Sequence, residues 1–137
     1  MGGFNLLEHP ADVGIEARGD SLEEAMAWLA AGMFSLIVDP ATVRPTDSRH
    51  VSVTSRDRVS SVVDWLNELL YQYETTGFLL SHCQVSLGPG GRLEAECRGE
   101  PLDPHRHHVL TVVKAATYHQ LVVSQTHQWY IRVILDV

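Results

Sequence analysis

The feature that most constrains the fold is a pair of helix-length segments, each with a single apolar stripe, within the first 77 residues. In the first segment, Ser21 and Glu24 have the spacing of a capping box. Apolar residues then recur at helical spacing as far as Ile37, and Asp39-Pro40 ends the pattern. The second segment reads "RDRVSSVVDWLNELLYQYETT" and is followed by Gly77. Both stripes need another layer of structure to cover them.

That other layer is predicted to be a β-sheet. Residues 11–18, "ADVGIEAR", alternate in polarity, as does "RHVSVTS" at 49–55. After Gly77 the pattern predicts strands alone: a hairpin of "FLLSHCQVSL" and "RLEAECRG" around "GPGG", a strand over 109–123, and a last strand, "WYIRVILDV", after the turn "SQTHQ". We therefore expect an α+β fold, a mostly antiparallel sheet with two helices packed on one face, in a single domain covering residues 1–137.

Composition and charge exclude several functional classes. The chain of 137 residues has one domain's length, and the formal net charge of -7 argues against tight direct binding of a nucleic-acid backbone. No apolar run approaches the ~20 residues that span a bilayer, and the first residues do not read as a signal peptide. Two cysteines, Cys83 and Cys97, are expected to be reduced and to lie near each other across the hairpin. These observations predict a cytoplasmic protein that does not enter a membrane.

The most informative polar residues are two aspartates. Asp12 lies on the more polar side of the first predicted strand, and Asp136 lies on the more polar side of the last. If the two strands are neighbours, both carboxylates converge near the α-carboxylate of Val137. Three oxygen ligands suit a hard divalent cation such as Ca²⁺, Mg²⁺ or Mn²⁺. The alternative is two unrelated surface aspartates and a frayed end.

Two other groups of residues were weighed as sites. His105, His107 and His108 can bind Zn²⁺ in principle, but they lack a cysteine pair or HExxH spacing, so a solvated polar loop is the favoured interpretation. Lys114 stands in an apolar segment, where it either extends to solvent along its aliphatic stem or balances the carboxylates. The sequence contains no GxSxG, Walker A or GxGxxG motif, and no nucleophile–base pair is apparent.

Several segments together resemble the archease family. They are "HPADVGIEARGDSLEEA", "DWLNELLY", "GEPLDPHRH", "VKAATYHQL" and "RVILDV", and the resemblance runs from about Leu7 to Val137. One departure is Pro10, which stands where the family usually has threonine. Proline removes a hydroxyl and an N–H donor and fixes φ, so any orienting contribution of that threonine to Asp12 is absent here.

The resemblance implies a function that the patterns alone do not. Archeases are small α+β proteins that serve as non-catalytic cofactors of the RtcB-type RNA ligase in tRNA splicing and RNA repair. They promote guanylylation of the ligase and its multiple turnover. The family's metal site matches Asp12, Asp136 and Val137 here, and Lys114 and His9 match further functional positions. The resemblance thus predicts a metal-binding RNA ligase activator, with calcium, magnesium or manganese as the cation, and not an enzyme.

Two alternatives from other classes stay open at this point. A metal-dependent phosphoester hydrolase would use Asp12 and Asp136 to hold the metal and one of the loop histidines as base, which requires that loop to lie beside the metal. A chaperone-like binding module would expose an apolar patch of several hundred Å² and would be indifferent to metal.

Overall fold

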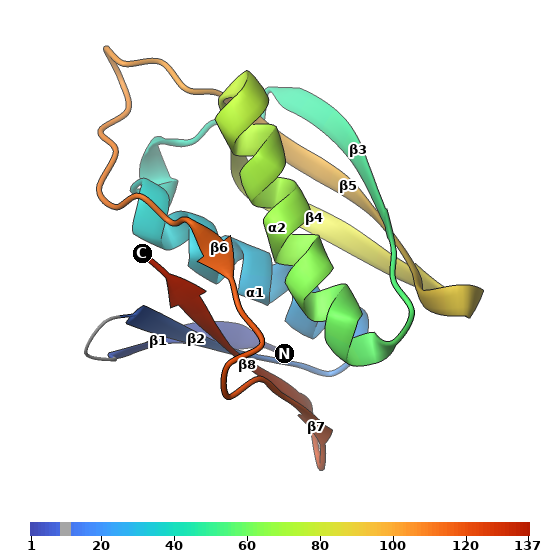
Figure 1. Cartoon of the computed structure of the whole chain (residues 1–137). Helices are drawn as coiled ribbons and strands as arrows, with labels where there is room; N and C mark the ends of the chain where they lie inside the picture. Colours follow the sequence, from blue (N-terminus) through green and yellow to red (C-terminus); the bar gives the residue numbers. More distant parts are fainter. Residues whose placement is uncertain (9–11) are drawn as a thin grey trace.

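The computed structural model describes residues 1–8 and 12–137 and shows an α+β fold with two antiparallel sheets (Figure 1). The larger sheet has the strand order β1-β2-β8-β6, and β7 also pairs with β8. Its bounds are β1 (Gly3–Glu8), β2 (Asp12–Gly19), β6 (Ala115–Ala116), β7 (Val122–Gln125) and β8 (Trp129–Asp136). The smaller sheet has the order β3-β5-β4, with β3 (Asp47–Thr54), β4 (Phe78–Gly88) and β5 (Arg92–Pro101). The α+β class and the antiparallel pairing predicted from the sequence are confirmed, although the strands are divided between two sheets.

The two helices begin and end where the sequence predicts. In α1 (Leu22–Ile37) the backbone N–H of Glu24 donates to Ser21 Oγ over 3.0 Å. In α2 (Arg58–Thr76) the N-cap is Asp57, and Gly77 ends the helix with a φ of 75°, a left-handed conformation that glycine adopts without a steric penalty. Short 3₁₀ turns follow α1 at Pro40–Thr42 and join β4 to β5 at Pro89–Gly91.

The core lies between the helices and both sheets. The helix α1 contacts β1, β2 and β8 of the larger sheet and β4 of the smaller one, so it joins the two sheets. The helix α2 packs on the smaller sheet and against β6 (Figure 1). The side chains with less than 2 % exposure include Trp65, Phe78, Ile15, Met26, Leu29, Met33, Leu66 and Ile131. Neither helix of the described chain is both long and apolar enough to cross a membrane.

The observed fold differs from the sequence-based expectation at two places. The strand β1 was not predicted, although it pairs along its length with β2. The single strand predicted over 109–123 is wrong, because only β6 and part of β7 fall within it. Residues 109–114 first pass the end of α1, where the N–H of Leu110 donates to Ile37 O over 2.8 Å. The segment comes alongside β8 only near β6. The residues before it therefore have no neighbouring strand with which to form a continuous β-strand.

The two cysteines lie where the hairpin prediction placed them. Cys83 and Cys97 occupy directly paired positions on β4 and β5, and both are free thiols. Cys97 is buried and Cys83 is partly buried, which agrees with reduced cysteines that belong to the interior. The hydrogen bond with Cys97, together with burial, raises the pKa of the Cys83 thiol above its ordinary value.

Candidate functional site

Two aspartates are paired across strands at one end of the larger sheet. The strands β2 and β8 are antiparallel neighbours, and Asp12 is the direct partner of Asp136 in their register. Directly opposed residues in an antiparallel pair project from the same face, with Cβ atoms roughly 4.5–5.5 Å apart. Asp136 is exposed and Asp12 is half-buried. The condition that the sequence left open, that the two strands are neighbours, is therefore met, and their aspartates form a cross-strand pair at the sheet's end.

The segment around β6 brings Lys114 to the same end. The backbone N–H of Lys114 donates to the carbonyl of Asp136 over 2.8 Å, and Ala115 is the register partner of Asp136. The Lys114 side chain is exposed. Val137 follows at once and packs, partly buried, against the edge of the core. We call this group, Asp12, Lys114, Asp136 and Val137, the tip.

An asparagine that sequence reasoning missed holds this segment in place. Asn67, in α2, accepts a hydrogen bond from the N–H of Ala116 over 2.8 Å and donates to the carbonyl of the same residue over 3.4 Å. Thr117 adds a hydroxyl bond of 2.8 Å to Ile134 O on β8. The two Asn67 contacts substitute for the strand pairing that β6 lacks on its α2 side. The signal in the sequence was the single amide residue within "DWLNELLY".

The outer face of the larger sheet, further along β2 and β8 from the tip, carries a polar network centred on Glu16. Its carboxylate accepts hydrogen bonds from Tyr130 Oη at 2.9 Å and from Arg18 Nη1 and Asn5 Nδ2 at 3.3 Å. Burial by itself would raise the pKa of Glu16, but the bonds from Tyr130, Arg18 and Asn5 outweigh it, and the pKa is lowered. The guanidinium of Arg18 also lies 4.9 Å from the centre of the Tyr130 ring. These bonds hold the Glu16 carboxylate in place and favour its ionised form.

The loop histidines differ from one another. His105 and His108 are exposed, whereas His107 is only 5 % exposed, so the expectation of a solvated loop is wrong for that residue. Its Nδ1 accepts from the N–H of Asp103 over 2.8 Å, which leaves Nε2 to carry the proton and donate to Glu100 Oε2 over 3.0 Å. His107 therefore ties the loop to β5, and it is not free to act as a base.

Glu100 is the buried partner in that arrangement. Its carboxylate accepts from the backbone N–H of Arg44 over 2.8 Å and from the guanidinium of Arg106, in addition to His107. Burial opposes ionisation, yet these donors together lower the pKa of Glu100 below its ordinary value. A fully bonded carboxylate of this kind is typical of a structural network that anchors a loop.

The donor set at the tip decides which ligands it suits. Among residues 1–8 and 12–137, no three His, Cys, Asp or Glu side chains gather into a group that could hold a metal. The protein donors that do gather at the tip are the Asp12 and Asp136 carboxylates, with Val137 as the next residue. Such oxygen donors fit hard cations and do not fit the nitrogen and sulfur preference of structural Zn²⁺. His9, named as a functional position from the resemblance, lies outside the described residues.

Comparison with known proteins identifies the family. The chain matches the archease protein family over residues 4–137. It is 37% identical to a protein archease of Saccharolobus islandicus over 132 residues, which cover 96% of this chain and 95% of the relative. It is 34% identical to a protein archease of Pyrococcus abyssi over 135 residues, with 95% of each chain covered.

A solved structure supports the same assignment. The solution structure of Methanobacterium thermoautotrophicum protein 1598 superimposes with a TM-score of 0.85 at 34% sequence identity, covering 98% of this chain and 99% of that one. Sequence and fold agree over nearly the full length of both proteins. From these matches we conclude that the chain belongs to the archease family.

Proposed function

We propose that this chain is a non-catalytic activator of an RtcB-type RNA ligase, acting in tRNA splicing and RNA repair. It promotes guanylylation of the ligase and supports its multiple turnover. Membership of the archease family supports a protein cofactor role. The observation that carries the proposal is the cross-strand pair of Asp12 and Asp136 at one end of the sheet, with Lys114 hydrogen-bonded beside it.

The tip has the construction of a contact surface. Its charged side chains stand at the end of a sheet whose interior is packed by Val133 and Leu135, and two elements, β2 and β6, hold β8 from both sides. The backbone there is fixed before a partner arrives, which reduces the entropy lost on binding. A rigid end with carboxylates and one ammonium group suits insertion into a basic, nucleotide-binding cleft of a partner enzyme.

We further propose that the tip binds a divalent cation through Asp12, Asp136 and the α-carboxylate of Val137. Like charges directly opposed on neighbouring strands are unfavourable, and a cation between them reverses the sign of that interaction. Ca²⁺, Mg²⁺ and Mn²⁺ all accept such oxygen donors. A divalent cation supplies charge stabilisation to phosphate oxygens when it is bound. Lys114, from the adjacent segment, provides a second positive group that can meet a phosphate or a carboxylate of the partner.

The decisive experiment is ligase guanylylation with and without this protein. Radiolabelled GTP is incubated with the ligase, and the covalent adduct is measured over a titration of Mn²⁺ and in the presence of chelator. The proposal expects faster adduct formation and more ligation cycles per ligase molecule when the protein is added. An unchanged rate across the whole Mn²⁺ range would exclude an activating role, and GTP turnover by the protein alone would show an enzyme instead.

A further inference from the structure

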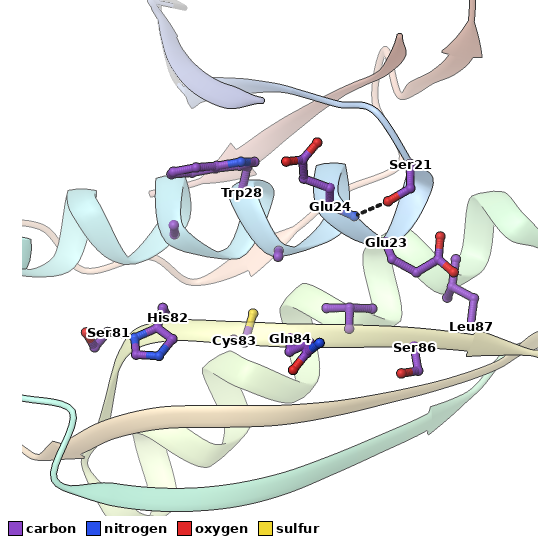
Figure 2. A pocket seen from close by; sticks show the side chains of 13 residues that line it. Ser21, Glu23, Glu24, Trp28, Ser81, His82, Cys83, Gln84, Ser86 and Leu87 are labelled. Atoms are coloured by element: carbon purple, nitrogen blue, oxygen red, sulfur yellow. Dashed lines mark hydrogen bonds between the residues drawn. The ribbon is translucent and has the colours of Figure 1, made fainter. Parts of the chain in front are cut away.

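A groove separates α1 from β4 on the surface away from the tip. Its volume is about 740 Å³. One wall consists of α1 residues, among them Glu23, Ala27, Trp28 and Ala31, and the other wall is the run Ser81 to Leu87 of β4. Figure 2 shows the helix and the strand running side by side along its length. None of these residues belongs to the tip, so the groove is a separate feature.

The strand wall of the groove is an edge. Successive side chains of a strand point to opposite faces, so seven consecutive residues can line one cavity only if the edge of the strand faces it. The strand order confirms this, because β4 is the outer strand of the smaller sheet and β5 lies on its other side. Pairing with β5 is regular from His82 to Gly88, beyond the irregularity between Leu80 and His82. The outward backbone N–H and C=O groups of this stretch are thus presented in the spacing of a strand.

The sequence of β4 leaves that edge open to pairing. Proteins usually protect an edge with charged residues or proline, and "FLLSHCQVSLG" contains no Asp, Glu, Lys, Arg or Pro. The opposite edge strand, β3, does carry such residues, in Asp47 and Arg49. An unprotected regular edge beside an apolar helix face is the arrangement that accepts an added strand from a partner.

The chemistry of the helix wall selects the partner. Trp28 is 38% exposed, and its ring lies 6.4 Å from that of Phe4, which supports it from behind. Ala27 and Ala31 leave room beside it. The side chain of Glu23 projects toward the strand in Figure 2, and in the part of the chain that the structure describes it has no ion-pair partner. Glu24 lies on the same wall, but its carboxylate accepts a hydrogen bond from the backbone N–H of Asp20 over 2.6 Å, so Glu23 is the open carboxylate there.

We propose that this groove binds an extended, basic segment of a partner protein, which adds as a strand to the edge of β4. Backbone hydrogen bonds to β4 provide register, an apolar side chain of the segment packs on Trp28, and a lysine or arginine side chain meets Glu23. The net charge of -7 works against a second copy of this chain in that position and favours a cationic partner.

The test uses defined peptides and the full chain. An acetylated, amidated octapeptide of alternating lysine and valine is titrated into the ¹⁵N-labelled protein, and amide shifts and amide hydrogen exchange are followed by NMR. The proposal expects shifts confined to α1 and β4, and slowed exchange at alternate residues of His82 to Leu87. Two further peptides carry N-methyl groups on either alternate set of backbone nitrogens. Only one set faces β4, so one peptide should lose binding and the other should keep it.

Variants and a charge-reversed peptide complete the design. Trp28→Ala should weaken binding about tenfold, since a buried aromatic anchor contributes more than 1 kcal/mol. Glu23→Lys should weaken it about threefold, whereas Glu74→Lys, the same charge change on exposed α2 surface, should leave it unchanged. Thermal melting checks that each variant is folded.

Several results would overturn the proposal. They are equal binding of both methylated peptides, loss of both, equal binding of an alternating glutamate–valine peptide, or shifts centred on the tip. If sedimentation instead shows that the protein alone is a dimer and that Trp28→Ala dissociates it, that result would assign the groove to a second copy of the chain. Because no ligase is present, none of these outcomes depends on the proposed activation of an RNA ligase.

Discussion

The indole Nε1–H of Trp65, in α2, donates a hydrogen bond of 3.0 Å to the main-chain carbonyl of Met26, in α1. Both residues are fully buried. The bond joins the helix that spans the two sheets to the helix that holds β6, so it links the core to the tip. A tryptophan that is both buried and bonded in this way fixes the relative position of the two helices.

Replacing Trp65 by phenylalanine should therefore destabilise the fold. The change removes the donor, leaves the Met26 carbonyl without that bond and opens a small cavity. We expect a loss of about 1–3 kcal/mol in the free energy of unfolding. Urea unfolding followed by circular dichroism measures it. As a control, Trp28→Phe at a partly exposed position should stay within about 0.5 kcal/mol of the wild type.

Asp136→Asn should separate metal binding from fold stability. Without a cation, removing one of two opposed carboxylates relieves repulsion, so the melting temperature should be equal to or slightly above that of the wild type. With Mn²⁺ or Ca²⁺ the wild type should gain stability through binding to the folded state, and the variant should gain little. Melting with and without each cation measures both effects. A cation-induced rise in the variant as large as in the wild type would remove Asp136 from the ligand set.

A C-terminal extension tests the remaining ligand. Adding residues after Val137 converts its carboxylate to an amide, which removes one negative charge and places chain beside the cation. We expect weaker metal binding by calorimetry and weaker stimulation of ligase guanylylation, to a similar extent as with Asp136→Ala. The same tag placed before Met1 should have little effect. Full affinity and full stimulation in the C-terminally extended protein would show that Val137 is not a ligand.

Lys114→Ala should reduce ligase stimulation much more than stability. The side chain is exposed, and the bond that this residue makes to Asp136 comes from its backbone N–H, which alanine retains. Guanylylation rates and melting curves of the same preparations measure the two effects. Arg56→Ala, which removes an exposed cation away from the tip, is the matched control. A large fall in melting temperature with unchanged activity per folded molecule would make Lys114 structural.

His50 should make stability depend on pH. On the open face of the smaller sheet its Nδ1 lies 2.7 Å from Glu96 Oε1 and its Nε2 lies 2.9 Å from Glu94 Oε1. The bonds to Glu96 and Glu94 raise the pKa of His50 above its ordinary value of 6.5. A raised pKa means that the charged form stabilises the fold below about pH 6.5 and that this contribution is lost as pH rises through the folded-state value.

The measurement is the difference in melting temperature between wild type and His50→Gln across pH 5 to pH 9. The wild type should hold its largest advantage at the acidic end, and the difference should shrink as the pH increases. A difference that is constant over this range would mean that His50 titrates with the same pKa in the folded and unfolded states. Parallel curves for His105→Gln, at an exposed loop position, provide the control.

The elements with strong periodicity could be predicted from the sequence. The caps at Ser21 and Gly77 mark the limits of the helices, and alternation in "ADVGIEAR" and "RVILDV" placed Asp12 and Asp136 on corresponding faces of their strands. Nothing local in the sequence shows that these two strands are neighbours. The sequence posed this only as a condition for a shared site, and the register of β2 and β8 meets it.

Where the sequence failed, the deciding contacts were between distant residues. The apolar run at 109–123 has strand composition, but a strand forms only beside a partner, and most of this run passes the end of α1 instead. In the sequence, nothing distinguishes His107 from the other histidines of "HRHH". In the fold it is buried and hydrogen-bonded to Glu100 on β5. The role of Asn67 depends on the backbone of Ala116, which no pattern around either residue encodes.

The pairing of β2 with β8 also has a consequence for how the protein is made. During synthesis β2 leaves the ribosome early, with α1 behind it, while β8 is among the last segments to emerge. Until then the inner edge of β2 has no strand beside it, and only its hairpin with β1 can form. Such long-range closure is slow and leaves strand edges open to wrong partners. We expect nascent chains that stop short of β8 to be held by chaperones, and the larger sheet to close only after release.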